Sequence, residues 1–244
     1  MGLGPRSVAL CVLTCTCRNY RPNALLKLLL PSVARHTPRH DPLTIVLYLG
    51  INHDDRLLNA TGWRRRVQTA WPATRFVPVH PRKRRRHLPW NELIRAAYHA
   101  PDRHDYFIRT QDDTVVLTTG WARVMVDALR NMSNLGVVGP TFAEGNRQVL
   151  AAMDATHRTH LCIFRGTYYP EVFDNYYIDD WITHVYGANR TRKLHAVRVS
   201  HCLSYHGQQY LAASNQGPML EATLRDGREL VAQRGRRCVA KYTH

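Results

Sequence analysis

The stretch YFIRTQDDTVVLTTGW, residues 106–121, joins a strand-like segment to a helical one through two adjacent carboxylates, Asp112 and Asp113. The residues before the acids have the apolar pattern of a buried strand. Those after them predict a turn and an amphipathic helix with Thr118 or Thr119 as its N-cap. Adjacent carboxylates at a buried strand end repel each other and resist desolvation, so they require a compensating cation.

The spacing of this acidic pair allows two interpretations. In the first, Asp112 and Asp113 bind an oxygen-liganded Mg²⁺ or Mn²⁺ that bridges to the phosphates of a substrate. In the second, the pair forms a turn or is neutralised by Arg109, which lies just upstream. The spacing by itself favours neither interpretation.

Strand and helix patterns alternate over the first 110 or so residues, which is typical of a doubly wound α/β fold. Strands are expected at 8–14, 42–50, 75–79 and 105–110, and helices at 23–36, 63–71 and 92–100. The 244 residues are enough for one large α/β domain, and at most for two small ones. We therefore predict a single domain, 1–244, with a mostly parallel central sheet flanked by helices.

In sheets of this kind ligands bind outside the carboxyl ends of the strands. The candidate loops are residues 14–19, 50–55 and 111–114. The chain lacks both the GxGxxG pattern and the P-loop pattern, so neither of those phosphate cradles is expected.

The chain is strongly basic, with 34 Lys and Arg against 18 Asp and Glu and a formal charge of +16. This excess predicts an anionic partner, which could be nucleic acid, an acidic membrane face or a phosphorylated small molecule. Much of the charge lies in compact runs such as PRKRRRH (81–87), whereas the aromatic residues cluster separately at 168–181. Nucleic-acid binding predicts basic and aromatic residues interleaved on one face, so the pattern argues against it.

Two further groups of residues could carry chemistry. Asp179 and Asp180 lie among aromatic residues, which raises the proton affinity of an acid and suits a general base, but acids in this position can also begin a helix. His201 and His206 lie in HCLSYHG, and imidazole is a frequent metal ligand, although a lone histidine is more often structural.

The cysteines and the N-terminus predict the compartment. Cys11, Cys15 and Cys17 lack a fourth ligand and the spacing of a metal site, so we interpret them as reduced and buried. The first strand pattern begins too early to leave room for a signal peptide, and the apolar run at 25–30 is too short to span a membrane. A soluble, cytoplasmic protein without an integral membrane segment is expected, with the Golgi lumen as the alternative if an N-terminal anchor is missing.

Together these features resemble the nucleotide-sugar-dependent glycosyltransferases of the GT-A fold. DYFIRTQDDTVVLTTGW (105–121) is similar to the strand and aspartate motif of fringe-type and β1,3-galactosyltransferase-like enzymes. YYIDDWITHVYG (176–187) is similar to the acidic pair that these enzymes carry before a short helix. GVVGP (136–140), RTHLCIF (158–164) and the terminal histidines agree with the family's order of elements over residues 8–210. The motifs are short, and only the acidic ones are moderately specific.

The resemblance implies a role for each matching residue. Asp113 would bind the divalent metal, Mn²⁺ or Mg²⁺, with His206 as a further ligand and His201 as the alternative. Gln111 stands where many relatives have an acid. Asp180, beside Asp179, matches the catalytic base of inverting members. The donor contacts would be made by Thr14, Thr16, Arg18, Asp54, Asp55, Asn91 and Asp112.

The function expected from the resemblance is transfer of a sugar, hexosyl or pentosyl, from a UDP- or GDP-linked donor to a hydroxyl of a glycan or other acceptor, with inversion. Residues 1–117 would form the nucleotide-sugar-binding half and residues 118–244 the acceptor and catalytic half. Loop 81–89 could close over the donor. The alternatives are a metal-dependent phosphohydrolase or nuclease, a basic nucleic-acid-binding protein, and an inactive binding module of the same fold.

Overall fold

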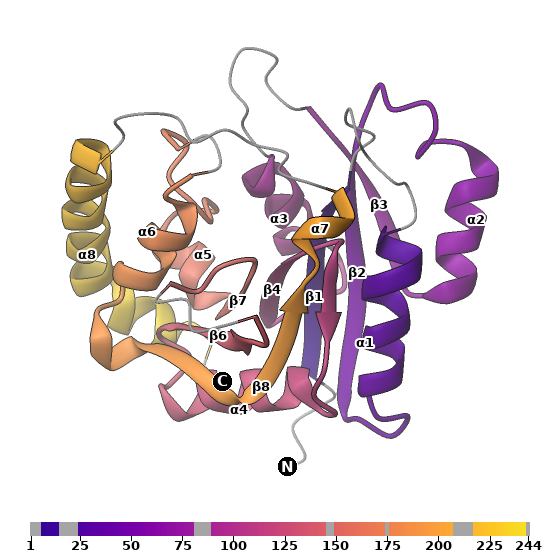
Figure 1. The fold of residues 1–244 in the computed structure, drawn as a ribbon. Coiled ribbons are helices and arrows are strands. Elements are labelled where there is room, and N and C mark those ends of the chain that lie inside the picture. The colour runs from indigo at the N-terminus through magenta and orange to yellow at the C-terminus, as the bar shows by residue number, and fades with distance from the viewer. Residues whose placement is uncertain are drawn as a thin grey trace.

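The computed structural model describes residues 6–14, 24–80, 89–144, 149–173, 176–206 and 217–242, with only the backbone at Arg6 and His206. Within these residues eight strands form one sheet in the order β3-β2-β1-β4-β7-β6-β8-β5 (Figure 1). The strands are β1 Arg6–Thr14, β2 Leu43–Asn52, β3 Thr74–Val79, β4 Tyr106–Gln111, β5 Thr114–Val116, β6 Val137–Phe142, β7 Met153–His157 and β8 Thr191–His201.

The first four strands predicted from the sequence form one parallel half of the sheet. Strand β1 pairs in parallel with β2 and β4, and β2 pairs in parallel with β3. The other half is mixed, because β7 is antiparallel to both β4 and β6, β8 is parallel to β6, and β5 is antiparallel to β8. The prediction of an α/β domain with a mostly parallel sheet is confirmed.

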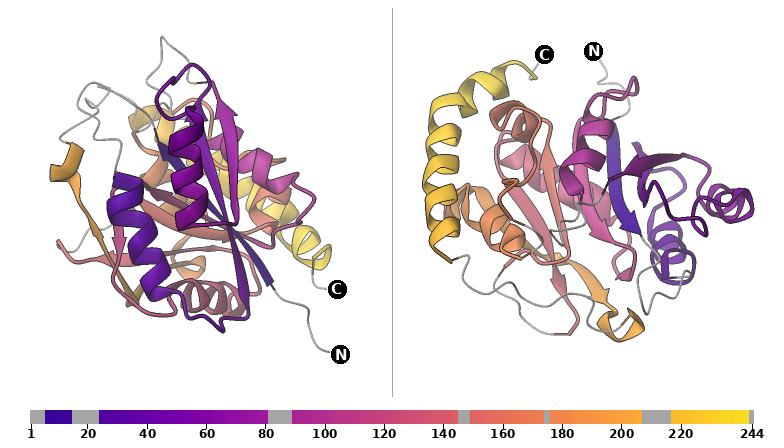
Figure 2. Two further views of the ribbon diagram at one scale, coloured as in Figure 1. Left: turned by 90° about the vertical axis from the view of Figure 1, so that its right-hand side faces the viewer. Right: turned by 90° about the horizontal axis from the view of Figure 1, so that it is seen from above.

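Helices cover both faces of the sheet (Figure 2). They are the π-helix η1 Leu25–Leu29, α1 Leu30–His36, α2 Thr61–Ala70, α3 Trp90–Tyr98, α4 Trp121–Asn131, α5 Thr159–Ile163, α6 Ile178–His184, the 3₁₀ helix η2 Ala188–Arg190, α7 Leu203–His206 and α8 Gly217–Ala240. The helix expected at 23–36 is therefore two joined pieces. Pro31 lies at the junction of the two pieces, and because it has no amide proton it interrupts the hydrogen-bond pattern of a continuous helix.

Alternate residues of β1 enter two separate hydrophobic cores, because side chains on a strand point to opposite faces. Val8, Leu10 and Val12 pack with residues of α1, α2 and α4. Ala9 and Cys11 pack on the other face with residues of α3, α5, α6 and α8. Burial on both faces explains why the first strands have continuous apolar sequences.

The expected N-cap of α4 is wrong. Gly120 occupies the cap position with a left-handed φ of 73°, and the cap makes no side-chain hydrogen bond. The Thr119 hydroxyl instead lies 3.1 Å from His36 Nδ1, and the Thr118 hydroxyl accepts a hydrogen bond from the Arg198 amide. Both threonine hydroxyls therefore contact other elements and do not cap the helix, and Gly120 tolerates the left-handed conformation at the cap position.

The cysteines differ in part from expectation. Cys11 is buried and free, as predicted, while Cys15 and Cys17 lie outside the described residues. Cys162 of α5 and Cys238 of α8 form a disulfide with a Cα separation of 5.8 Å, a pairing that was not predicted from the sequence. Disulfides persist in oxidising compartments, so this bond weighs against the cytoplasmic location, which stays a prediction. In the described part of the chain, no helix is long and apolar enough to cross a membrane.

Candidate active site

The carboxyl ends of β1 and β4 bring two predicted donor-binding residues into contact. These strands are parallel neighbours with Leu13 opposite Gln111, so the residues that follow each strand lie side by side. The Thr14 hydroxyl donates a hydrogen bond of 2.8 Å to Asp112 Oδ2, and both side chains are buried. The hydrogen bond fixes the orientation of the Asp112 carboxylate at the edge of the sheet where ligands of α/β folds bind.

Asp113 lies against His201 from the far end of the chain. Strand β5 begins directly after Asp113 and is antiparallel to β8, with Thr114 opposite His201. His201 Nε2 is 3.2 Å from Asp113 Oδ1 and 2.8 Å from Gln111 Oε1. Both Asp113 and His201 are buried. Three polar side chains with oxygen and nitrogen ligand atoms therefore meet at one point.

Asp113 and His201 have side chains that can bind a divalent cation. In the described part of the chain, His201 Nδ1 is buried without a hydrogen-bond partner, and Asp113 Oδ1 is buried with its 3.2 Å contact to His201 Nε2 but no hydrogen bond. No set of three His, Cys, Asp or Glu side chains in the described ranges is placed to hold a metal. Mg²⁺ and Mn²⁺ commonly take one or two protein ligands and fill the remaining positions with substrate phosphates and water. The residues present fit a cation bound in that way.

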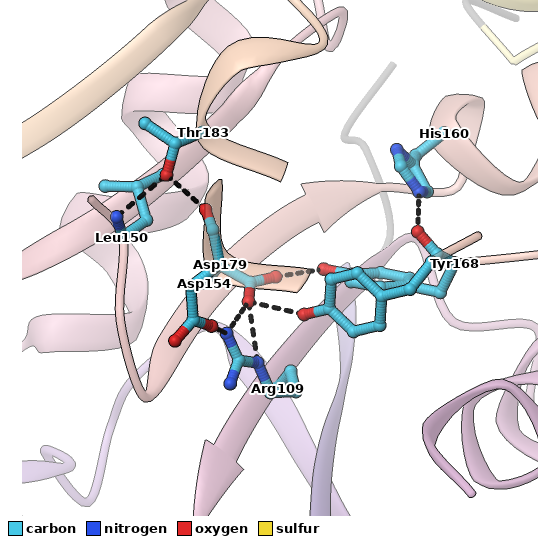
Figure 3. A network of polar contacts seen from close by, with 8 residues as sticks. Arg109, Leu150, Asp154, His160, Tyr168, Asp179 and Thr183 are labelled. Carbon is cyan, nitrogen blue, oxygen red and sulfur yellow. Dashed lines mark hydrogen bonds and ion pairs between the residues drawn. The ribbon is translucent and has the colours of Figure 1, made fainter. Parts of the chain in front are cut away.

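Arg109, the alternative partner for Asp112 and Asp113, lies instead in an ion network with Asp154 and Asp179 (Figure 3). Arg109 is 1% exposed and lies in β4 with its guanidinium between Asp154 of β7 and Asp179 of α6. Arg109 Nε donates to Asp154 Oδ2 at 2.7 Å, and Nη2 donates to Asp179 Oδ1 at 2.6 Å. The guanidinium also lies 5.6 Å from the ring centroids of both Trp90 and Tyr169.

Asp154 is the centre of this network. Besides Arg109, it accepts hydrogen bonds from the Tyr168 hydroxyl at 2.6 Å and the Tyr169 hydroxyl at 2.7 Å. Burial by itself would lower the pKa of Arg109, but Tyr169, Asp154 and Asp179 outweigh it, and the pKa lies well above its ordinary value. Burial and the charge of Asp154 raise the pKa of Tyr168 well above normal. The network therefore holds a charged guanidinium and neutral phenols.

Helix α6 carries the second acidic pair. Burial raises the pKa of Asp179, and the charge and hydrogen bond of Arg109 oppose that rise. Tyr177 is the N-cap, so both acids lie in the first turn, where the helix dipole favours negative charge. The side chain of Asp180 is partly exposed, whereas that of Asp179 is held by Arg109. The two adjacent acids thus have different surroundings.

The remaining predicted site residues make other contacts than those of the Asp113–His201 cluster, or they lie outside the described residues. The Asn91 amide accepts from the backbone of Tyr168 and Tyr169 and donates to the Tyr169 carbonyl, so it holds that loop in place. Asp55 is buried and accepts from the Leu58 amide in a turn after β2, and Asp54 beside it is exposed. The structure does not describe Thr16, Arg18, the side chain of His206 or most of loop 81–89.

Asp154 and its two tyrosine partners were not predicted from the sequence. A signal was available, because Asp154 is a single acid within the apolar segment LAAMDATH (150–157), and an acid buried in a strand requires a partner. That partner is Arg109, 45 residues away in the chain, and no local pattern connects the two.

Comparisons with known proteins show the fold. No protein-family model matches the sequence, and no curated protein matches it. Among solved structures, GalNAc-T7 with UDP, GalNAc and Mn²⁺ is 13% identical, with a TM-score of 0.56 over 93% of this chain and 48% of that one. A TarS 1–349 structure from S. aureus with UDP-GlcNAc is 11% identical, with a TM-score of 0.58 over 91% of this chain and 66% of that one.

A third similar structure is the mannosyltransferase PcManGT from Pyrobaculum calidifontis with GDP-Man and Mn²⁺. It is 13% identical, with a TM-score of 0.53 over 93% of this chain and 74% of that one. The chain spans about half the length of the GalNAc-T7 structure. Together with the sheet topology, these likenesses show that the chain has the GT-A fold of nucleotide-sugar glycosyltransferases, as its sequence motifs predicted.

Proposed function

We propose that this protein is a divalent-metal-dependent glycosyltransferase that moves a sugar from a nucleotide-sugar donor to an acceptor hydroxyl. The observation that carries the proposal is the buried contact between Asp113 and His201 at the strand ends of a GT-A fold. The similar structures of GalNAc-T7 and PcManGT contain a nucleotide together with Mn²⁺, which supports the same donor class here.

In this proposal Asp113 and His201 hold the metal. We favour His201 over the originally expected His206 because its Nε2 atom lies 3.2 Å from Asp113 Oδ1. The metal, when bound, would neutralise charge on the leaving diphosphate. Gln111 Oε1 lies 2.8 Å from the same Nε2 atom and holds the ring in place in the metal-free site, and metal binding at Nε2 would displace this hydrogen bond. Asp112, fixed by Thr14, would accept a hydrogen bond from a ribose or sugar hydroxyl of the donor.

Asp180 is the proposed base that takes the proton of the attacking acceptor hydroxyl. Attack from the face opposite the leaving diphosphate gives inversion. Asp179 has a supporting role, because its ion pair with Arg109 anchors the first turn of α6 and so fixes the backbone that carries Asp180. A donor-binding half at 1–117 and an acceptor half at 118–244 belong to the same proposal, as do a UDP- or GDP-linked donor and a hexosyl or pentosyl group.

The metal and donor sites are tested by titrating UDP- and GDP-sugars into the protein by calorimetry, with and without Mn²⁺. Mn²⁺-dependent binding is expected for at least one donor. It should weaken about 100-fold or more in Asp113→Ala and about tenfold in His201→Gln, because each removes a metal ligand. The control His195→Gln lies exposed on the same strand as His201 and should bind as the wild type does. Binding that is unchanged in Asp113→Ala would reject the site.

The base is tested separately by measuring sugar transfer and donor binding in the same variants. Asp180→Asn should lower the transfer rate at least about 100-fold and leave donor affinity unchanged, since a general base acts mainly in the transition state. Asp127→Asn, an exposed carboxylate on α4, is the matched control. Hydrolysis of phosphoesters without any acceptor would instead favour the phosphohydrolase alternative, and salt-sensitive DNA retention without donor binding would favour nucleic-acid binding.

A further inference from the structure

A cationic pocket lies away from the proposed active site, between the ends of α5 and α8. It has a volume of about 520 Å³ and is lined by Arg165, Arg234, Arg237, Lys241 and the disulfide of Cys162 and Cys238. None of these residues is among those proposed to bind the donor or the metal or to act as the base. Arg234 and Arg237 belong to one basic run of the sequence, but Arg165 comes from another part of the chain, so their meeting around one cavity requires an explanation.

The charges of the four cations are not neutralised by carboxylates of the described residues. Within the described residues, none of them forms an ion pair with a carboxylate. Arg234 donates to the Ile163 carbonyl at 3.3 Å, and Lys241 Nζ lies 5.5 Å from the Tyr242 ring centroid. The dipole at the carboxyl end of α8 favours Arg237 and Lys241, but it gives no reason for Arg165, which belongs to another element.

Arg165 has a backbone conformation that does not favour an arginine. Its φ is 54°, in the left-handed region, directly after α5. The Gly166 amide donates to the Leu161 carbonyl at 2.7 Å, so the helix ends in the motif whose left-handed position is usually glycine. An arginine there makes the backbone less favourable than a glycine would. Arg103 has a similar left-handed φ of 47°, so the conformation by itself does not indicate binding, but it means that glycine can replace Arg165 without backbone strain.

An apolar pocket adjoins the cationic one. Its volume is about 430 Å³, and Arg165 and Arg234 line both pockets. The other lining residues are mostly apolar and include Phe164, Pro170, Trp181 and Leu230. The acidic side chain in this lining, Asp226, lies 3.7 Å from Arg225. Cations at one end and aromatic rings at the other define a site for a ligand that has both kinds of group.

We propose that the two pockets together bind a phosphate monoester whose organic group is apolar. A phosphate dianion offers two charges and three acceptor oxygens to Arg165, Arg234, Arg237 and Lys241. Its organic group lies against Phe164, Trp181 and Leu230. The disulfide holds the two elements that carry the cations together against their mutual repulsion, so the site is formed before the ligand binds. The site does not depend on the proposed sugar transfer.

The test measures binding of hexyl phosphate, inorganic phosphate and hexanol by calorimetry at low ionic strength. Hexyl phosphate should bind about tenfold or more tightly than inorganic phosphate, because burying each methylene adds affinity, and hexanol should bind weakly or not at all. Affinity should fall as NaCl is raised. Equal binding of hexyl phosphate and inorganic phosphate, or no binding of either, would overturn the proposal.

Variants locate the binding. Arg165→Gly removes one cation and places glycine where the backbone favours it, so the variant should fold and bind hexyl phosphate about tenfold more weakly. Arg236→Gln is the matched control, since Arg236 is an exposed neighbour on α8 that does not line either pocket. An equal loss in Arg236→Gln, or no loss in Arg165→Gly, would reject the site. Reduction of the disulfide should also weaken binding.

A vesicle experiment distinguishes the two sources of such a ligand. A lipid headgroup is identified if the protein co-sediments with phosphatidic acid vesicles but not with phosphatidylcholine vesicles. This co-sedimentation should be lost in Arg165→Gly and kept in Arg236→Gln. Binding of hexyl phosphate without vesicle retention identifies a soluble monoester. Vesicle retention that is equal in both variants would show general attraction to the basic surface and would overturn a built site.

Discussion

Arg109 is a buried arginine whose charge is balanced by two carboxylates. Its guanidinium is buried with Asp154 and Asp179 on one side and aromatic rings on the others. Such a network contributes little net free energy when complete, because desolvation opposes the attraction. Removing one partner is different, since it leaves an uncompensated buried charge.

Arg109→Ala is therefore expected to lower the free energy of unfolding by about 3–5 kcal/mol. The matched control is Arg130→Ala. Arg130 forms an exposed ion pair with Asp127, which lies one helical turn before it in α4, so this substitution should change the free energy of unfolding by less than about 1 kcal/mol. Urea denaturation followed by circular dichroism measures both. Equal effects of the two substitutions would show that the buried network has no special role.

His160 gives stability a dependence on pH. Burial lowers its pKa to about 4, although the Tyr168 carbonyl and Asp154 oppose this. The ring lies 2.8 Å from the Tyr186 hydroxyl and 2.9 Å from the Tyr168 carbonyl, which suits a neutral ring with one donor and one acceptor nitrogen. Between the unfolded pKa near 6.5 and the folded value the unfolded chain binds more protons, so stability falls as pH falls through this window.

Lowering the pH from 7 to 5 should therefore cost the wild type about 2 kcal/mol more than it costs His160→Gln. Glutamine can supply one donor and one acceptor but does not titrate, so the variant keeps the hydrogen bonds and loses the proton uptake. Urea midpoints at the two pH values give the difference. The interpretation fails if the wild type and the variant show the same loss.

At the scale of elements, α8 depends on glycine for its close approach to α6. A Cβ at Gly227 would lie 2.7 Å from Val185 Cγ2 and 3.2 Å from Trp181 Cζ2. These two helices cover the second core together with α5. The 24-residue α8 is thus positioned by backbone contact as well as by side-chain packing.

Gly227→Ala should lower stability by about 1–3 kcal/mol through overpacking, even though alanine is the better helix former. Gly62→Ala is the opposite control, because Gly62 lies in α2 with nothing within 4 Å of the added Cβ, and it should stabilise by about 0.5–1 kcal/mol. Thermal and urea denaturation check both. A stabilising Gly227→Ala would mean that α6 and α8 can separate at no cost.

At the scale of the whole molecule, the disulfide joins residues 76 positions apart and closes much of the second half of the chain into a loop. Closing a loop of this length restricts the unfolded state and is worth about 4.5 kcal/mol in the chain-entropy model. It links α5, which follows β7 directly, to the helix near the end of the chain.

Replacing both residues, Cys162→Ser with Cys238→Ser, should lower the free energy of unfolding by about 2–4 kcal/mol. Dithiothreitol should lower the urea midpoint of the wild type but not that of the double variant. Cys202→Ser, at a free and partly buried cysteine, is the control and should keep the wild-type response to the reductant. No effect of dithiothreitol on the wild type would contradict a stabilising disulfide.

The sequence by itself determined the parallel half of the fold. The apolar runs that became β1, β2 and β4 have to be buried on both faces, and the intervening helical patterns supply the cover. Sequence also placed Asp112 and Asp113 at a strand end, because a strand pattern ends where charge begins. These features depend on neighbouring residues in the sequence, so they can be predicted without knowing how the rest of the chain folds.

Only the tertiary structure decided which distant residues meet. The pairing of β5 with β8 places His201 beside Asp113. Arg109 forms ion pairs with Asp154 and Asp179, not with the acidic pair that follows it in the sequence. Cys162 forms a disulfide with Cys238. The physical reason is common to all three. A buried charge or thiol must find its partner in space, and the partner is chosen by strand order and helix packing, which leave no trace in the spacing of residues along the chain.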